Sequence, residues 1–154
     1  MKRIKRKKGG FAIRLPEEER ELLASLPGQL VELLDATAGD ADALSDPAVA
    51  RLFPDAYSAV DADLNDEYRR LMTDDLRERH RASLETLARG SRAEQVDEGE
   101  LYAWMTALTQ LRLVLGTRLG ITEDAYPRED EPAFAVYSYL SWLQEQVVEA
   151  LSSS

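Results

Sequence analysis

The sequence predicts a mainly α-helical fold, an irregular bundle of four to five helices, and three kinds of observation support this prediction. Apolar residues recur at steps of three and four along several segments, which is the spacing of one helix face. Capping residues open these segments, and glycine or proline residues close them. The alternating pattern of a strand appears in the first fifteen residues, where a short β-hairpin is one of two interpretations.

Length and charge restrict the class of protein. The 154 residues are enough for one domain with a substantial core, and 44% hydrophobic with 31% charged residues is an ordinary soluble balance. The net charge of −10 disfavours a general attraction to nucleic acid or anionic lipid. Residues 1–8 hold six cations and no anion, so they carry +6 and leave −16 on the remainder.

The chain contains no cysteine, which excludes disulfides, thiol nucleophiles and thiolate metal sites. Its single histidine, His80, argues against a histidine-based zinc site. No apolar run approaches the roughly 18 residues of a membrane span, and no apolar signal-peptide core follows the basic residues 1–8. We therefore expect a cytoplasmic protein with no metal, no cofactor and no membrane segment.

Residues 1–15 form a basic N-terminal arm. Phe11, Ile13 and Leu15 occupy alternate positions, which is the period of a short strand. The Gly-Gly pair before them could turn the chain back and complete a hairpin, which would have to lie on the helices because an isolated hairpin is marginal in water. The alternative is a disordered basic tail.

The helical bundle domain is expected over residues 16–151, with residues 152–154 as a frayed tail. Pro16 suits a first helical position, and the three glutamates that follow it suit the positive end of a helix dipole. A leucine-rich stripe comes next, and Pro27 interrupts it. We therefore expect a kink or a break near Ser25.

The chain after this helix is expected to be a loop at residues 35–46, which are small and acidic. Asp46 and Pro47 then combine an N-cap with a first-position proline, and they predict a short helix that Pro54 ends.

Two longer helices are expected further along. One runs from Asp63 to Leu87 and is ended by the Gly90–Ser91 pair. Its charged run at residues 78–81, which includes His80, is expected to face solvent. The other begins at Pro132 and presents a wide apolar face as far as residue 151.

The stretch from Leu101 to Gly120 is apolar on nearly every face, and it predicts a central helix that contacts protein on all sides. Asp97 and Glu100 have the spacing of a capping box, and Val96 precedes the cap as in a hydrophobic staple. Gly120 is a natural stop for this helix.

Arg112 is the most informative polar residue of this central helix, and Arg118 is the second. If the Arg112 guanidinium is buried, it needs a carboxylate or several carbonyls, because an unpaired buried charge is very costly. The candidate partners are Asp74, Asp75 and Glu145. Arg112 would then fix the helix register; alternatively, it binds an anion or an acidic group of a partner.

Two motifs that resemble functional sites fail on inspection. Residues 61–65 begin like a calcium-binding loop, but Asp66 replaces the required glycine and Met72 the bidentate glutamate; capping carboxylates at a helix start explain them as well. Gly116 and Gly120 close a helix, so they do not form a phosphate loop. Gly116 is instead expected to let another helix approach closely. No Ser–His–Asp arrangement can be argued, and we expect no catalytic residue.

Four segments resemble an actinobacterial family of small helical proteins filed as a domain of unknown function, the AosR-like oxidative-stress regulators. The similar segments are residues 104–120, 66–80, 136–151 and 5–19, so the resemblance covers essentially the whole chain. Its most specific marks are Trp104, Leu111, Arg112, Gly116 and Arg118. The resemblance implies regulation or interaction, as in a transcription regulator, and it supplies no catalytic residues. A thiol switch cannot operate in this cysteine-free chain.

The expected function is therefore that of a non-enzymatic regulatory or adaptor protein with a protein partner, acting as a monomer or a homodimer. The candidate binding residues are Trp104, Arg112, Arg118, Lys2, Arg3, Lys5, Arg6, Lys7 and Lys8. One alternative is a nucleic-acid-associated regulator that uses the basic arm. A weaker alternative is a small-molecule-binding bundle, which would show a closed pocket lined by Arg112, Arg118 and tyrosines, where an adaptor would show an exposed apolar groove.

Overall fold

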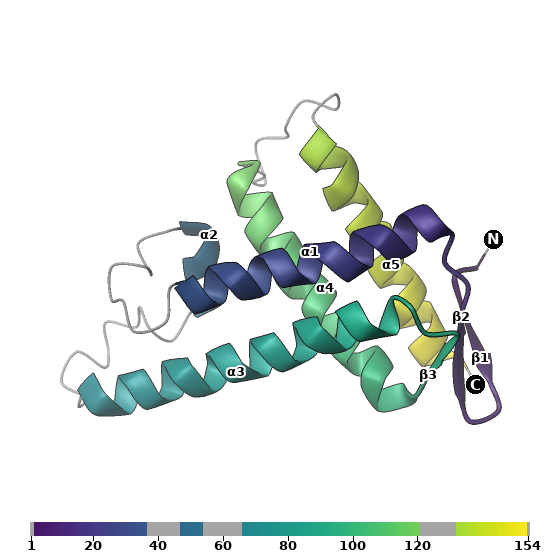
Figure 1. Cartoon of the computed structure of the whole chain (residues 1–154), viewed down its shortest axis with the longest axis horizontal. Helices are drawn as coiled ribbons and strands as arrows, with labels where there is room; N and C mark the ends of the chain where they lie inside the picture. The colour runs from purple at the N-terminus through teal and green to yellow at the C-terminus, as the bar shows by residue number, and fades with distance from the viewer. Residues whose placement is uncertain (1, 37–46, 54–65, 121–131, 154) are drawn as a thin grey trace.

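The computed structural model describes residues 2–36, 47–53, 66–120 and 132–153, with the backbone alone at residues 66–70 and 72 (Figure 1). In chain order, the elements are β1 (Ile4–Lys7), β2 (Gly10–Ile13), α1 (Glu17–Ala36), α2 (Pro47–Ala50), α3 (Asp66–Gly90), β3 (Gln95–Val96), α4 (Glu98–Arg118) and α5 (Pro132–Ser152). Helices dominate, and a small antiparallel sheet is built on the N-terminal hairpin, which confirms the predicted fold class.

The helices pack as two pairs that cross. α1 and α3 lie side by side, and both contact α4, which also packs along α5 (Figure 1). The sheet lies at one end of the bundle, with β1 against α5 and β2 against α4. The central place of α4 follows from the many directions in which its apolar side chains point.

The N-terminal arm is a hairpin and not a disordered tail. Gly9 has a φ of 87°, a conformation that glycine adopts without a Cβ clash, and it turns β1 back into β2. β2 also pairs with β3, so that Phe11 lies opposite Val96 in the centre of the three-stranded sheet. Ile4, Phe11 and Ile13 are buried in the same apolar core as the helices, which is the support an isolated hairpin lacks.

α1 runs without interruption through Pro27, so of the two outcomes expected near Ser25, a kink or a break, the break does not occur. Proline removes one helical hydrogen bond. However, Leu23 precedes Pro27 and Leu30 follows it, and all three are buried. Burial of one continuous face on both sides of the proline therefore outweighs the lost bond.

α4 begins as the sequence predicts. The Asp97 carboxylate accepts the Glu100 backbone N–H at 2.7 Å, and the Glu100 carboxylate accepts the Asp97 backbone N–H at 3.4 Å, which completes the capping box. The expectation that protein surrounds the helix on all sides was only partly met. Tyr102 is 48% exposed and Leu113 is 37% exposed, so one stripe of α4 faces outward.

The boundaries of the other helices differ little from the predicted ones. α2 begins at Pro47, and a hydrogen-bonded turn carries the chain on to Phe53. α3 and α5 cover most of their predicted ranges. The predicted loop beyond residue 36, the Asp46 cap and the calcium-like residues 61–65 lie outside the described residues. Within the ranges given above, no group of three acidic or histidine side chains could hold a metal, and no helix is long and apolar enough to cross a membrane.

Candidate functional site

The predicted binding residues fall in separate places, and Trp104 is part of the core. Its side chain is fully buried. A Cβ added to Gly90 would lie 2.6 Å from Trp104 Nε1, so the indole occupies space that only a glycine leaves at the end of α3. Trp104 therefore joins α3 to α4 and offers no binding surface.

Arg112 projects from α4 onto α5, where neutral groups hold it. Its Nε donates to Ser141 Oγ at 2.9 Å, and its Nη1 donates to Gln144 Oε1. The guanidinium carbon lies 5.6 Å from the centre of the Tyr137 ring, within the range of a cation–π contact. The half-buried cation is thus fixed in position without a carboxylate among the described residues.

The expected pairing of Arg112 with an acidic residue was therefore wrong. Asp74 and Asp75 pair with arginines of their own helix, and Glu145 is exposed. The sequence could not show this, because the choice depends on the rotation of α5 about its axis. That rotation turns Ser141, and not Glu145, toward α4.

Arg112 shares a cleft of about 140 Å³ with Arg51, between the end of α2, α4 and α5. The other lining residues are Thr109, Leu113, Gly116, Thr117 and Tyr137. None of these residues is acidic. An added Cβ at Gly116 would lie 3.2 Å from Tyr137 Cε2, so Gly116 admits the ring of α5 as expected.

An apolar hollow of about 280 Å³ adjoins this cleft, and Arg51, Thr109 and Leu113 line both. The remaining residues of the hollow are Leu52, His80, Met105, Thr106 and Gln110. The cleft and the hollow therefore combine a cationic end with an apolar end.

His80 lies in this hollow and not in solvent, which corrects the prediction. Its Nε2 lies 2.9 Å from the Leu52 carbonyl oxygen, and its Nδ1 lies 2.6 Å from Gln110 Nε2. Because a carbonyl only accepts, Nε2 carries the proton and Nδ1 accepts from the amide. Burial lowers the pKa of the imidazole, and the bond to Leu52 opposes that effect. The signal was in the sequence, since Leu76 and Leu84 stand four residues on either side of His80.

Arg118 lies on another face of α4 and does not share a pocket with Arg112. It lines a groove of about 130 Å³ between α1 and α4. The rest of this leucine groove is formed by Leu26, Gln29, Leu30, Leu33, Leu111, Val114 and Leu115. Arg118 and Gln29 are exposed, and the apolar residues are buried or half-buried.

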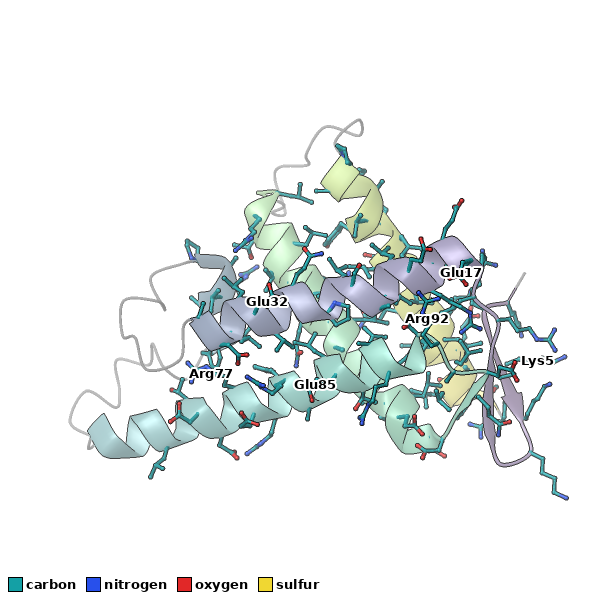
Figure 2. The ribbon with its side chains drawn as sticks, in the orientation of Figure 1. Lys5, Glu17, Glu32, Arg77, Glu85 and Arg92 are labelled. Atoms are coloured by element: carbon teal, nitrogen blue, oxygen red, sulfur yellow. The ribbon has the colours of Figure 1, made fainter. Side chains whose placement is uncertain are left out.

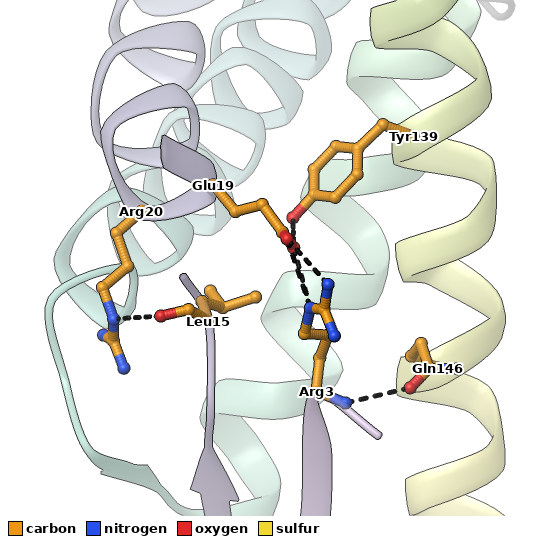
Figure 3. Close-up of polar contacts among 6 residues, drawn as sticks. All are labelled: Arg3, Leu15, Glu19, Arg20, Tyr139 and Gln146. Carbon is orange, nitrogen blue, oxygen red and sulfur yellow. Dashed lines mark hydrogen bonds and ion pairs between the residues drawn. The ribbon is translucent and has the colours of Figure 1, made fainter. Parts of the chain in front are cut away.

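Arg3 and Arg6, the two arginines within residues 1–8, bind the helical body. The Arg3 guanidinium pairs with Glu19 of α1 at 3.0 Å, and the Tyr139 hydroxyl donates to the same carboxylate at 2.8 Å (Figure 3). This pairing raises the pKa of Arg3, and burial together with the bond to Glu19 raises the pKa of Tyr139. Arg6 donates to Ser153 Oγ and to a carbonyl near the end of α5.

The lysines of the arm behave differently. Lys2, Lys5, Lys7 and Lys8 are the only lysines of the chain, and all four are exposed. None forms an ion pair within the described part of the chain. Lys5 lies at the outer edge of the sheet in Figure 2. Arg3 and Arg6 thus hold the arm on the helical body, whereas the side chains of the four lysines point into solvent.

Sequence reasoning missed Arg20 and Arg51. The Arg20 guanidinium donates to four carbonyl oxygens, one of which, that of Leu15, is drawn in Figure 3. It thereby joins the start of α1 to the turn after α3. The sequence around Arg20 is like that around any arginine in the first turns of a helix, and Arg51 follows a short helix of small residues. Nothing in the sequence therefore distinguished either arginine as a structural or binding residue.

The comparisons with known proteins agree with the resemblance found in the sequence. A family model described as a domain of unknown function, DUF2017, matches residues 1–151. The putative oxidative stress regulator AosR of Mycobacterium leprae is 31% identical over 159 residues, which cover 88% of this chain and 72% of that protein. The oxidative stress regulator AosR of Mycobacterium tuberculosis is 29% identical over 192 residues, which cover 99% of this chain and 88% of that protein. The same figures hold for AosR of Mycobacterium bovis. No solved structure matches the chain.

Proposed function

The chain belongs to the family described as a domain of unknown function, DUF2017, and we propose that it is a non-enzymatic regulatory protein that acts by binding another protein. The names of its relatives support a regulatory role, since they are called oxidative stress regulators and not enzymes. Their names do not say what they bind. The surface for a partner must therefore be argued from this chain.

The leucine groove between α1 and α4 is the observation that supports a protein partner. Its floor is apolar, and the exposed side chains of Gln29 and Arg118 stand at its rim. An apolar centre with a polar rim is the usual anatomy of a protein interface. A groove between two helices suits an apolar side chain of a partner helix, and a cation at its rim suits an acidic neighbour on that helix.

This proposal is tested by comparing tagged versions of the full chain as baits in native lysate. Leu33→Glu places a charge in the groove, and Arg118→Glu reverses the charge at the rim. Leu71→Glu is the matched control, because Leu71 is an exposed leucine on α3 that does not line the groove. We expect a partner that wild type and Leu71→Glu retain and that both groove variants lose, with thermal melts that show each variant to be folded at the temperature of the capture. Equal capture by all versions would refute the groove.

A nucleic-acid-associated regulator is the second candidate, and the four exposed lysines of the arm favour it. Lysines that form no ion pair with the described acidic residues can contact phosphates. If the body paired with every cation of the arm, no such contact would be possible. The acidic remainder of the chain opposes such binding. The two candidates are separable, because the lysines and the leucine groove lie on different elements.

A further inference from the structure

We propose that the cleft between the end of α2, α4 and α5 binds the oxyanion group of a small molecule, and that Arg112 and Arg51 are the residues that contact this group. Arg112 and Arg118 lie on different faces of α4 and line separate depressions. This inference therefore goes beyond the proposed protein partner and does not depend on it.

The charge balance around Arg112 is the first argument. The guanidinium is half-buried, and its described partners, Ser141, Gln144 and Tyr137, are all neutral. None of the described residues that line the cleft is acidic, and the second cation, Arg51, faces the same space. Two cations at one cleft of a chain with a net charge of −10 favour an anion there, since partial burial weakens the screening of their charge by water.

The position of the Arg112 guanidinium is the second argument. Bonds to Ser141 and Gln144 and the face of Tyr137 hold it in one orientation. An arginine has five N–H donors, and the two bonds leave three for a ligand. A planar fork of donors matches the paired oxygens of a carboxylate or a phosphate. Because the arginine is already fixed, an anion would lose little affinity to the ordering of this side chain.

The two threonines of the cleft offer a ligand no hydrogen-bond donor. The hydroxyl of Thr109 donates to the Met105 carbonyl at 3.0 Å, and that of Thr117 donates to the Leu113 carbonyl at 2.8 Å. Neither hydroxyl therefore has a hydrogen to offer a ligand in this arrangement. Among the described lining residues, the two guanidinium groups and the Tyr137 hydroxyl therefore remain as side-chain donors, and the two charged donors favour an oxyanion over a neutral polar group.

The size of the cleft limits the ligand to a head group with a short arm. A volume of about 140 Å³ is well below the roughly 300–1,000 Å³ of sites for larger ligands. The adjoining hollow of about 280 Å³ has apolar walls that include Leu52 and Met105. The ligand class is therefore a small phosphate monoester or carboxylate whose short alkyl arm reaches the hollow.

The test uses nuclear magnetic resonance of the full-length, nitrogen-15-labelled protein at constant ionic strength. Inorganic phosphate, acetate, butyl phosphate and butanoate are titrated separately while the backbone amide signals of Gly116 and Thr117, which line the cleft and are present in every variant, are followed together with the Arg112 Nε–H signal. We expect a saturable shift with a phosphate or a carboxylate head group, and the comparison shows which of the two the cleft prefers. Butyl phosphate or butanoate should bind more tightly than its head group alone, by up to roughly fourfold for each methylene that the hollow buries.

Three variants complete the experiment. Arg112→Gln should weaken binding by about tenfold or more, because it removes charged hydrogen bonds. Arg51→Gln should weaken it a few-fold and keep the fold intact, since Arg51 is exposed. Arg118→Gln is the control on the same helix and should bind as wild type does. The proposed site would be wrong if wild type showed no saturable shift, or if the Arg51→Gln and Arg112→Gln variants bound the anions as tightly as wild type does. Equal affinity for the head groups and their butyl forms would overturn the role of the hollow.

Discussion

At the scale of single residues, His80 shows how burial sets a protonation state. The neutral imidazole bridges the Leu52 carbonyl and the Gln110 amide, and its pKa lies below the ordinary value of 6.5. The unfolded chain therefore binds a proton more readily than the native chain. The free energy of unfolding should fall as the pH drops through 6.5, by at most about 1.4 kcal/mol per pH unit for one proton.

Urea unfolding of wild type and His80→Gln between pH 8 and pH 5 measures this dependence. The variant should lose the slope below pH 6.5 that wild type shows, whatever its absolute stability. Carboxylates titrate in both proteins at lower pH, and the comparison removes their contribution. Parallel curves for the two proteins would contradict a lowered pKa of His80.

Arg20 and Arg92 form a matched pair, because both join the start of α1 to the turn after α3. Arg20 donates to four backbone carbonyls, whereas Arg92 pairs with Glu17 in solvent (Figure 2). Arg20→Ala should lower the free energy of unfolding by about 2–4 kcal/mol, since it leaves part-buried carbonyls without donors. Arg92→Ala should change it by no more than about 0.5 kcal/mol. Denaturant melts of the two variants measure these changes in the free energy of unfolding. Equal losses of stability for Arg20→Ala and Arg92→Ala would contradict this account of Arg20.

Residue-scale predictions from the sequence succeeded where the partner is close along the chain. The capping box of Asp97 and Glu100 needed no knowledge of the fold. The partner of Arg112 lies 29 residues away on another helix, and it depends on how two helices are rotated and spaced. Residue type alone favours an acid there, and the fold instead supplies Ser141 and Gln144. The sequence therefore identified Arg112 as a candidate binding residue of the site but missed the second arginine, Arg51.

At the scale of elements, two helical glycines have opposite roles. A Cβ at Gly28 in α1 would meet nothing within 4 Å, whereas one at Gly90 in α3 would lie within 3 Å of the Trp104 indole. Gly28→Ala should stabilise the protein by about 0.5–1 kcal/mol through the lower entropy of the unfolded chain. Gly90→Ala should destabilise it by about 1–3 kcal/mol through overpacking. Thermal melts of both variants check the prediction, and a stabilised Gly90→Ala would show that the indole can shift freely.

Element boundaries were predicted well because caps, prolines and glycines act locally. The exception is Pro27, where the local rule favoured a break and the buried face of α1 prevails. The N-terminal hairpin could not be decided from its own residues, since its stability depends on the contacts of Ile4 and Phe11 with the helical core. Packing between elements thus decides what local pattern leaves open.

At the scale of the whole molecule, the absence of cysteine separates any regulation by this chain from thiol oxidation. Size and thermal stability should be the same in dithiothreitol and in mild peroxide. The remaining route for oxidation is methionine, and Met105 lines the apolar hollow. Light scattering and thermal melts in the two conditions check this, with mass spectrometry to detect methionine sulfoxide. A reversible, dithiothreitol-sensitive change in size would contradict it.

The distribution of charge over the whole molecule leads to the last prediction. Within residues 1–8, Arg3 and Arg6 are engaged with the body, so the four lysines are the cations of this segment left for phosphates. Binding to duplex DNA through the arm should then give a log–log salt slope no steeper than about −4, from roughly −0.9 for each phosphate contact. Affinity should depend little on sequence, because lysines that contact phosphates read no bases.

Fluorescence anisotropy with a labelled duplex at several salt concentrations measures this slope. Each Lys→Gln change in the arm should make the slope shallower by about one unit. Arg89→Gln, an exposed cation on α3, is the control and should leave the slope unchanged. If the full chain does not bind at low salt, or binds as well with all four lysines replaced, the arm has no role in nucleic-acid binding. Those exposed lysines would then serve the solubility of the hairpin edge, where charged side chains prevent pairing between sheets of neighbouring molecules.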